Sequence, residues 1–195
     1  MTSKTLSISL LALVALSACG EKDIILPGTR EPIRAEATQV NRALPISFAA
    51  PVANANWTHR NGGADHNSPQ PALGGSLSQI FAVDIGEGDS KGARITADPV
   101  VANGIVYTLD ARSHVTATTT GGAAVWSADI PPPTDTRSDA SGGGLAFGSG
   151  RLFVSTGYGT LTPLDPATGG VIWVQELDAP GTSAPTVVGD LAYVV

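Results

Sequence analysis

The sequence predicts an all-β protein: a partial β-propeller with about two complete four-stranded blades and the start of a third. Three similar stretches, at 98–110, 143–155 and 183–195, each place a tight turn between two short apolar strands. A Gly-Gly turn followed by a tryptophan occurs twice, with Trp126 and Trp173 47 residues apart. Glycine (23 residues) and proline (14 residues) are abundant, which favours many short strands over long helices.

The N-terminus reads as an export signal. Residues 1–18 carry Lys4 and then an apolar stretch from Leu6 to Leu16, too short to span a bilayer. The run Leu16-Ser17-Ala18-Cys19 resembles the lipobox of bacterial lipoproteins. That resemblance implies cleavage before Cys19 and acylation of Cys19, palmitate included, with a lipid anchor at the outer membrane facing the periplasm. Cys19 is the only cysteine, so an intramolecular disulfide is excluded.

Residues 19–56 carry scattered charges and prolines without a sustained period, and we expect the lipidated cysteine and a flexible tether there. The folded part is expected at 57–195, beginning with a turn-rich segment at Trp57. His59, Asp65 and His66 in this segment suggest either a metal site or polar residues of a surface loop. The spacing of seven between the histidines favours the loop.

Each blade follows one pattern. The predicted turns are Asn103-Gly104, Ser149-Gly150 and Gly189-Asp190, of which Asn-Gly is a strong hairpin signal. The strand after each turn carries an aromatic residue (Tyr107, Phe153, Tyr193), with spacings of 46 and 40 residues. Third strands are expected at 114–119 and 160–164, and fourth strands at 124–130 and 171–177. The blades are thus expected at about 97–130 and 143–177, with the next one starting at 183–195.

The tryptophans are predicted to be structural. Large aromatic side chains at one place in each blade would fill the wedge between neighbouring blades, so Trp126 and Trp173 are expected to act as spacers. A further strand is expected from Leu77 to Ile85, with Phe81 near the usual tryptophan position. It would complete a blade whose other strands come from elsewhere in a closed ring.

The run Leu164-Asp165-Pro166-Ala167-Thr168-Gly169-Gly170-Val171-Ile172-Trp173 resembles the repeat of quinoprotein-type propellers. The earlier copy is degenerate and keeps Thr120-Gly121-Gly122 and Trp126. Two families share this repeat, the pyrroloquinoline-quinone dehydrogenases and the BamB lipoproteins of the outer-membrane barrel assembly machine. The resemblance implies an eight-bladed ring, which at about 45 residues a blade needs about 360 residues. We therefore expect this sequence to be a C-terminally truncated, N-terminal part of such a ring.

The lipobox favours the non-catalytic lipoprotein, with no cofactor, metal or small-molecule substrate. The dehydrogenases commonly carry adjacent cysteines, a Ca²⁺ ligand set and a catalytic aspartate. This sequence has a single cysteine, and its acidic residues fall mostly at strand ends and turns, where capping explains them. These are Asp84, Asp98, Asp110, Asp129 and Asp165. The dehydrogenase remains an alternative.

The resemblance also implies a partner, the barrel-forming subunit BamA, together with unfolded outer-membrane proteins. A nucleic-acid partner is excluded, because the net charge is −6 and no basic run occurs. The loop from Leu177 to Thr182 is the candidate contact, with Leu177, Asp178, Ala179 and Gly181 as candidate partner-binding residues, although such a loop can also be a plain blade connection. A propeller lipoprotein that binds another envelope partner is a further alternative.

Overall fold

A computed structural model describes residues 27–28, 45–68, 70–130 and 140–195. The chain divides into two units, Met1–Ile46 and Ser47–Val195. The first unit has four described residues, at 27–28 and 45–46, and every strand belongs to the second. The predicted signal peptide and Cys19 lie outside the described residues. The described part of the chain is all-β, with no helix.

The first four strands form one antiparallel sheet in the order β1-β2-β3-β4. Its strands are β1 (Val100–Ala102), β2 (Ile105–Leu109), β3 (His114–Thr119) and β4 (Ala124–Asp129). The next four form a second sheet with the same order along the chain, β5-β6-β7-β8. They are β5 (Gly143–Gly148), β6 (Arg151–Thr156), β7 (Thr160–Leu164) and β8 (Gln175–Glu176). The hairpin of β9 (Thr186–Val188) and β10 (Leu191–Tyr193) belongs to a third blade, which we call the third unit.

The hairpin turns confirm the local chemistry that the sequence predicts. Asn103 and Gly104 both have positive φ, at 53° and 77°, and Ser149 and Gly150 have φ of 48° and 71°. Positive φ at both central residues gives a two-residue turn whose twist matches that of the flanking strands. Asparagine and glycine tolerate that conformation, so the Asn103-Gly104 turn can be predicted from the sequence.

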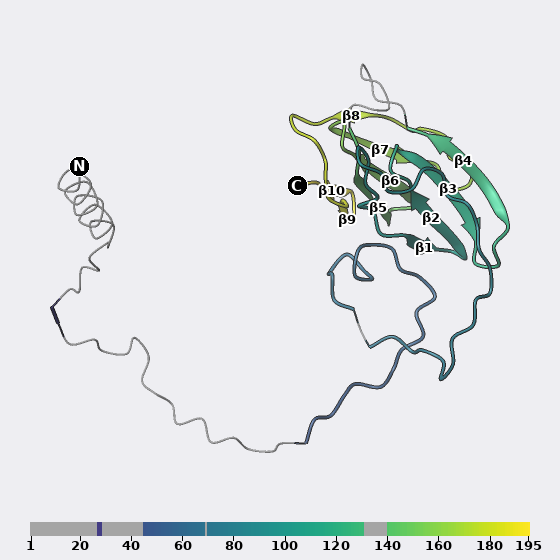
Figure 1. Ribbon diagram of the computed structural model, residues 1–195, viewed down its shortest axis with the longest axis vertical. Helices are drawn as coiled ribbons and strands as arrows, with labels where there is room; N and C mark the ends of the chain where they lie inside the picture. The colour runs from purple at the N-terminus through teal and green to yellow at the C-terminus, as the bar shows by residue number, and fades with distance from the viewer. Residues whose placement is uncertain (1–26, 29–44, 69, 131–139) are drawn as a thin grey trace, which may run out of the picture. The chain divides into compact units, whose positions relative to one another are not determined.

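The blades meet through their first strands. β5 packs against β1 and β2 on one side and against β9 on the other, and Figure 1 shows the two four-stranded sheets and the hairpin side by side. Val100 and Val115 of the first sheet and Leu145 and Val154 of the second share one core and are almost fully buried. Burial of each such side chain contributes about 1.5–3 kcal/mol, so the shared core stabilises both sheets together. This radial succession of four-stranded sheets confirms the β-propeller architecture.

Two predicted strands differ from those observed. The fourth strand of the second sheet is expected at 171–177, but only Gln175 and Glu176 form a continuous strand, besides a single bridge between Leu164 and Val171. The reason is Pro163, which accepts a hydrogen bond from Ile172 N–H at 2.9 Å but has no N–H to return.

The strand predicted at 77–85 is wrong as a strand, because no described residue forms a ladder with it. The segment nevertheless follows the first sheet. Phe81 lies against Gly122, and the carbonyl oxygen of Ile85 accepts a hydrogen bond from Thr116 Oγ1 at 3.4 Å. These contacts involve side chains, and without a ladder of backbone–backbone hydrogen bonds the segment is not a strand.

Candidate partner-binding site

The loop between β8 and β9 is fixed at both ends by the turn between β6 and β7. Leu177 N–H donates to Gly159 O at 2.7 Å, and Gly181 N–H donates to Thr156 O at 3.1 Å. Gly159 has a φ of +76°, and a side chain there would press against the carbonyl oxygen of Ala179. The loop is therefore held by main-chain hydrogen bonds on a rigid sheet, which is a common arrangement for a binding loop.

A hollow of about 190 Å³ opens over this loop. It is lined by residues 177–181 together with Val194 and Val195. Leu177 is half-buried and packs with Val194 against the core of the second blade, while Asp178 and Ala179 are exposed and Gly181 is buried. The lining is mostly aliphatic with one carboxylate, so it suits an apolar side chain of a partner with a basic or polar neighbour. The structure thus brings together the four predicted partner-binding residues, while their role remains a prediction.

The connection between the first and second blades is centred on one carbonyl group. Trp126 Nε1–H donates to Pro166 O at 2.9 Å, and the Tyr107 hydroxyl donates to the same oxygen at 3.3 Å. The two rings lie 5.9 Å apart, and Phe147 of β5 stacks on Tyr107 at 6.2 Å. Trp126 is half-buried and also covers Gly169 of the turn. An aromatic cluster therefore spans the two blades, and its polar atoms have partners.

Phe153 of the second blade lies where the second and third units meet, and it contacts Trp173, the other predicted spacer. Phe153 is buried and packs with Val187 of β9, and Trp173 contacts the Phe153 ring edge-to-face at 6.3 Å. Trp173 is 39% exposed and Tyr193 is 55% exposed.

Asp110 has a role that the sequence does not reveal. Its side chain is buried, and its carboxylate accepts hydrogen bonds from the N–H groups of Arg112 and His114, both at 2.7 Å, and from Glu87 N–H at 2.8 Å. The first two bonds close the turn between β2 and β3, as the capping explanation of the sequence expects. The third fastens a segment that lies 23 residues earlier, and nothing in a turn motif indicates it.

The nitrogen atoms of the two loop histidines are engaged. His59 Nε2 accepts from Val187 N–H at 3.0 Å and Nδ1 lies 3.0 Å from Thr58 Oγ1. His66 Nδ1 and Nε2 lie 2.9 Å from Arg60 O and 2.8 Å from Thr186 Oγ1. Across the described ranges no three histidine, cysteine, aspartate or glutamate side chains are grouped to hold a metal ion.

The pKa values of His59 and Tyr107 are shifted from their ordinary values. Burial lowers the pKa of His59, and the nearby His66 lowers it further. Burial also raises the pKa of Tyr107, with a smaller contribution from the negative charge of Asp165. Both shifts favour the neutral form of a side chain that lies at a contact between blades. In the part of the chain that the structure covers, no helix is long and apolar enough to cross a membrane.

The fold is shared with solved dehydrogenases. A europium-containing methanol dehydrogenase is 20% identical with a TM-score of 0.58, and the match covers 72% of this chain and 27% of that one. A quinohemoprotein alcohol dehydrogenase from Pseudomonas putida HK5 is 23% identical with a TM-score of 0.53, covering 71% of this chain and 22% of that one. The chain therefore spans about a quarter of the length of these proteins, and the likeness shows the fold alone.

BamB from Moraxella catarrhalis is 20% identical over 52% of this chain and 34% of that one, with a TM-score of 0.42, too low to carry an argument. None of the curated proteins matches the chain. A family match covers the last two strands of the first blade, the second blade and the third hairpin. The quinoprotein-type repeat recognised in the sequence is confirmed over residues 111–195, which match the family described as "Outer membrane protein assembly factor BamB".

Proposed function

We propose that the protein is a non-catalytic, lipid-anchored scaffold of outer-membrane β-barrel assembly. The observation that carries the proposal is the match of residues 111–195 to the family of that description. The lipobox ending at Cys19 supports it independently, since it would hold the protein at the periplasmic face of the outer membrane. The partner is the barrel-forming subunit BamA, with unfolded outer-membrane proteins as further ligands.

The geometry suits a docking role for the loop at 177–181. The loop carries a small apolar hollow on a fixed backbone, so binding a partner side chain costs little ordering entropy. Asp178, exposed at the rim, would pair with a basic residue of the partner and set its orientation. This site requires neither a metal nor a cofactor.

Photo-crosslinking in intact cells tests the proposal. A photoreactive amino acid replaces Ala179 in the loop, and a matched variant carries it at Asp190, in the hairpin turn between β9 and β10. We expect Ala179 to crosslink to the barrel-forming subunit and Asp190 to give little of that product. Equal yields at both positions, or an Ala179 product with a different envelope protein, would count against this partner.

The dehydrogenase alternative has a separate test. The purified protein is incubated with pyrroloquinoline quinone and Ca²⁺, and reduction of an artificial electron acceptor by simple alcohols is followed. A scaffold leaves the acceptor oxidised. Alcohol-dependent reduction above that of the quinone and Ca²⁺ alone would favour the enzyme. The crosslinking and dye-reduction assays therefore separate the two functions.

A further inference from the structure

Each hairpin leaves one N–H group of its first strand without a partner inside the hairpin. In a two-residue hairpin the residues next to the turn exchange hydrogen bonds, and the next residue directs its N–H away from the partner strand. In the three units that residue is Val101, Phe147 and Val187. They are spaced by 46 and 40 residues, the spacing of the repeat itself, so they are equivalent positions of three successive blades.

Three consecutive residues near the start of the folded unit accept these hydrogen bonds. Val101 N–H donates to Trp57 O at 2.7 Å, and Trp57 N–H returns a bond to Val101 O at 2.7 Å. Phe147 N–H donates to Thr58 O at 2.7 Å. The third bond runs from Val187 N–H to His59 Nε2 at 3.0 Å. One short segment therefore joins the first strands of all three blades.

The third bond differs chemically from the other two. Trp57 and Thr58 accept through main-chain carbonyl groups, which do not titrate in this pH range. His59 accepts through its imidazole, and Nε2 can do so only while it carries no proton. The neutral ring then carries its proton on Nδ1 and donates it to Thr58 Oγ1, 3.0 Å away.

The surroundings of His59 favour the neutral ring. The residue is 3% exposed. Its own segment contributes the charged or titratable side chains of His66, Asp65 and Arg60, and Arg60 is paired with Asp98 at 3.1 Å. The first strands β1, β5 and β9 contribute no ionisable side chain.

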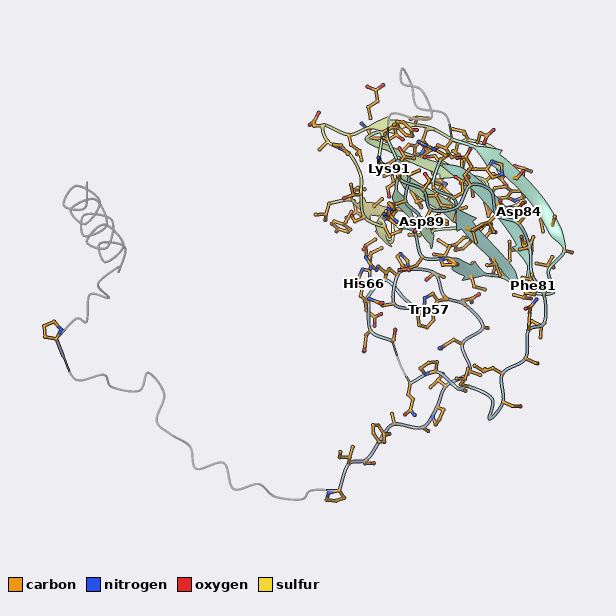
Figure 2. The ribbon with its side chains drawn as sticks, in the orientation of Figure 1. Trp57, His66, Phe81, Asp84, Asp89 and Lys91 are labelled. Atoms are coloured by element: carbon orange, nitrogen blue, oxygen red, sulfur yellow. The ribbon has the colours of Figure 1, made fainter. Side chains whose placement is uncertain are left out.

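We propose that residues 57–66 form an acid-sensitive clip, in which neutral His59 fastens the β9–β10 hairpin to the segment that holds the first two blades. Protonation at Nε2 replaces the acceptor with a donor that faces Val187 N–H, and the contact is lost. His66 holds the same hairpin through Thr186 Oγ1, at 2.8 Å, and Figure 2 shows His66 and Trp57 on this loop. Release of the third unit leaves the carbonyl-mediated contacts of the first two in place.

The sign of the pH dependence follows from the buried ring. The pKa of His59 in the folded protein lies below its ordinary value of 6.5. The contact is therefore complete above about pH 6.5 and is lost as the pH falls through the lower folded value. His66 lowers the pKa of His59, so removing the charge of His66 moves the release to higher pH.

Hydrogen exchange of the three equivalent amides provides the test, because two of them serve as internal controls. The purified protein is labelled at about pH 7.5 and at successively lower pH values over which it stays folded, with rates corrected for the intrinsic effect of pH. We expect the protection of Val187 N–H to fall about tenfold at the lowest of these pH values, as for the loss of one buried hydrogen bond. The protection of Val101 and Phe147 is expected to stay within about twofold. A uniform loss at all three amides, or none at Val187, overturns the proposal.

Variants separate titration from packing. His59→Gln keeps an acceptor in the side-chain amide but cannot titrate, so Val187 should stay protected at all of these pH values. His66→Gln should move the release upward in pH, and His114→Gln, which removes the exposed pair with Asp129 on the first blade, should not move it. Should His59→Gln fail to fold, the tautomer and titration of His59 in the wild-type protein, read from ring ¹⁵N shifts, decide instead. A ring protonated on Nε2 at about pH 7.5 overturns the proposal.

Discussion

Replacing Gly144 with alanine tests the contact between the second and third blades. Gly144 lies in β5 with its backbone outside the left-handed region, so alanine is tolerated by the local conformation. A Cβ atom at this position would meet the backbone of Ala184, with its nitrogen only 2.5 Å away. Real Cβ atoms do not approach so closely, and the third unit must move away from β5.

The magnitude follows from two opposing effects. Overpacking of a fixed contact costs about 1–3 kcal/mol, and the upper end applies because the obstacle is main chain. Alanine in place of glycine restores about 0.4–1 kcal/mol by restricting the unfolded chain. The net loss is about 2 kcal/mol. For a chain of this size that lowers the melting temperature by about 4–8 °C.

The assay is thermal and urea unfolding followed by circular dichroism, with Gly92→Ala as the matched control. Gly92 also lies outside the left-handed region, and a Cβ atom at that position would meet no atom of a more distant residue within 4 Å. We expect the control to melt at or slightly above the wild-type temperature. If Gly144→Ala melts together with Gly92→Ala, β5 does not pack against the third unit as described and the radial arrangement of the blades is refuted.

Three further predictions concern the buried polar atoms. Asp110→Asn places an amide group opposite Glu87 N–H. We expect the free energy of unfolding in urea to fall by about 1–3 kcal/mol and hydrogen exchange at the Glu87 amide to become faster. Unchanged exchange would show that this bond does not fix the segment. Trp126→Phe removes the hydrogen bond to Pro166 O and should cost about 1 kcal/mol, whereas Trp126→Ala should cost about 3; equal values would show that the ring adds nothing. Tyr107 should ionise above its ordinary pKa of 10.0 when the absorbance at about 295 nm is followed. The folded state should lose stability as the pH rises through that range. A titration of Tyr107 at the ordinary value would contradict its burial.

The sequence predicts the strands and turns of this fold well because each depends on its own residues. Asn103-Gly104 forms its hairpin through the positive φ values of those two residues, and the third strands at 114–119 and 160–164 are confirmed to the residue. The fourth strand of the second blade could not be predicted as well, since Pro163 lies on a neighbouring strand. The segment at 77–85 has the composition of a strand and lies near the first sheet, but it forms no ladder with any described strand.

The candidate site divides in the same way. The predicted partner-binding loop is local, so its residues gather as expected around the hollow at Leu177. Two hydrogen bonds join segments that are far apart in the sequence. One links Asp110 to Glu87 over 23 residues, and the other links Trp126 to Pro166 over 40 residues. No sequence motif at either residue of a pair indicates its partner. Repeat spacing indicates which positions are equivalent, but it does not indicate which atoms of the next blade they meet.

The clip at residues 57–66 shows how a repeat protein can control its blades separately. All three blades offer an equivalent N–H group, because a turn of two residues joins the first two strands in each. At Trp57 and Thr58 the acceptor belongs to the main chain, so a side-chain replacement leaves the acceptor in place. Only at His59 does the identity of the side chain decide whether the N–H group of the first strand has a hydrogen-bond acceptor. A single substitution there, or a single proton, acts on the third blade alone.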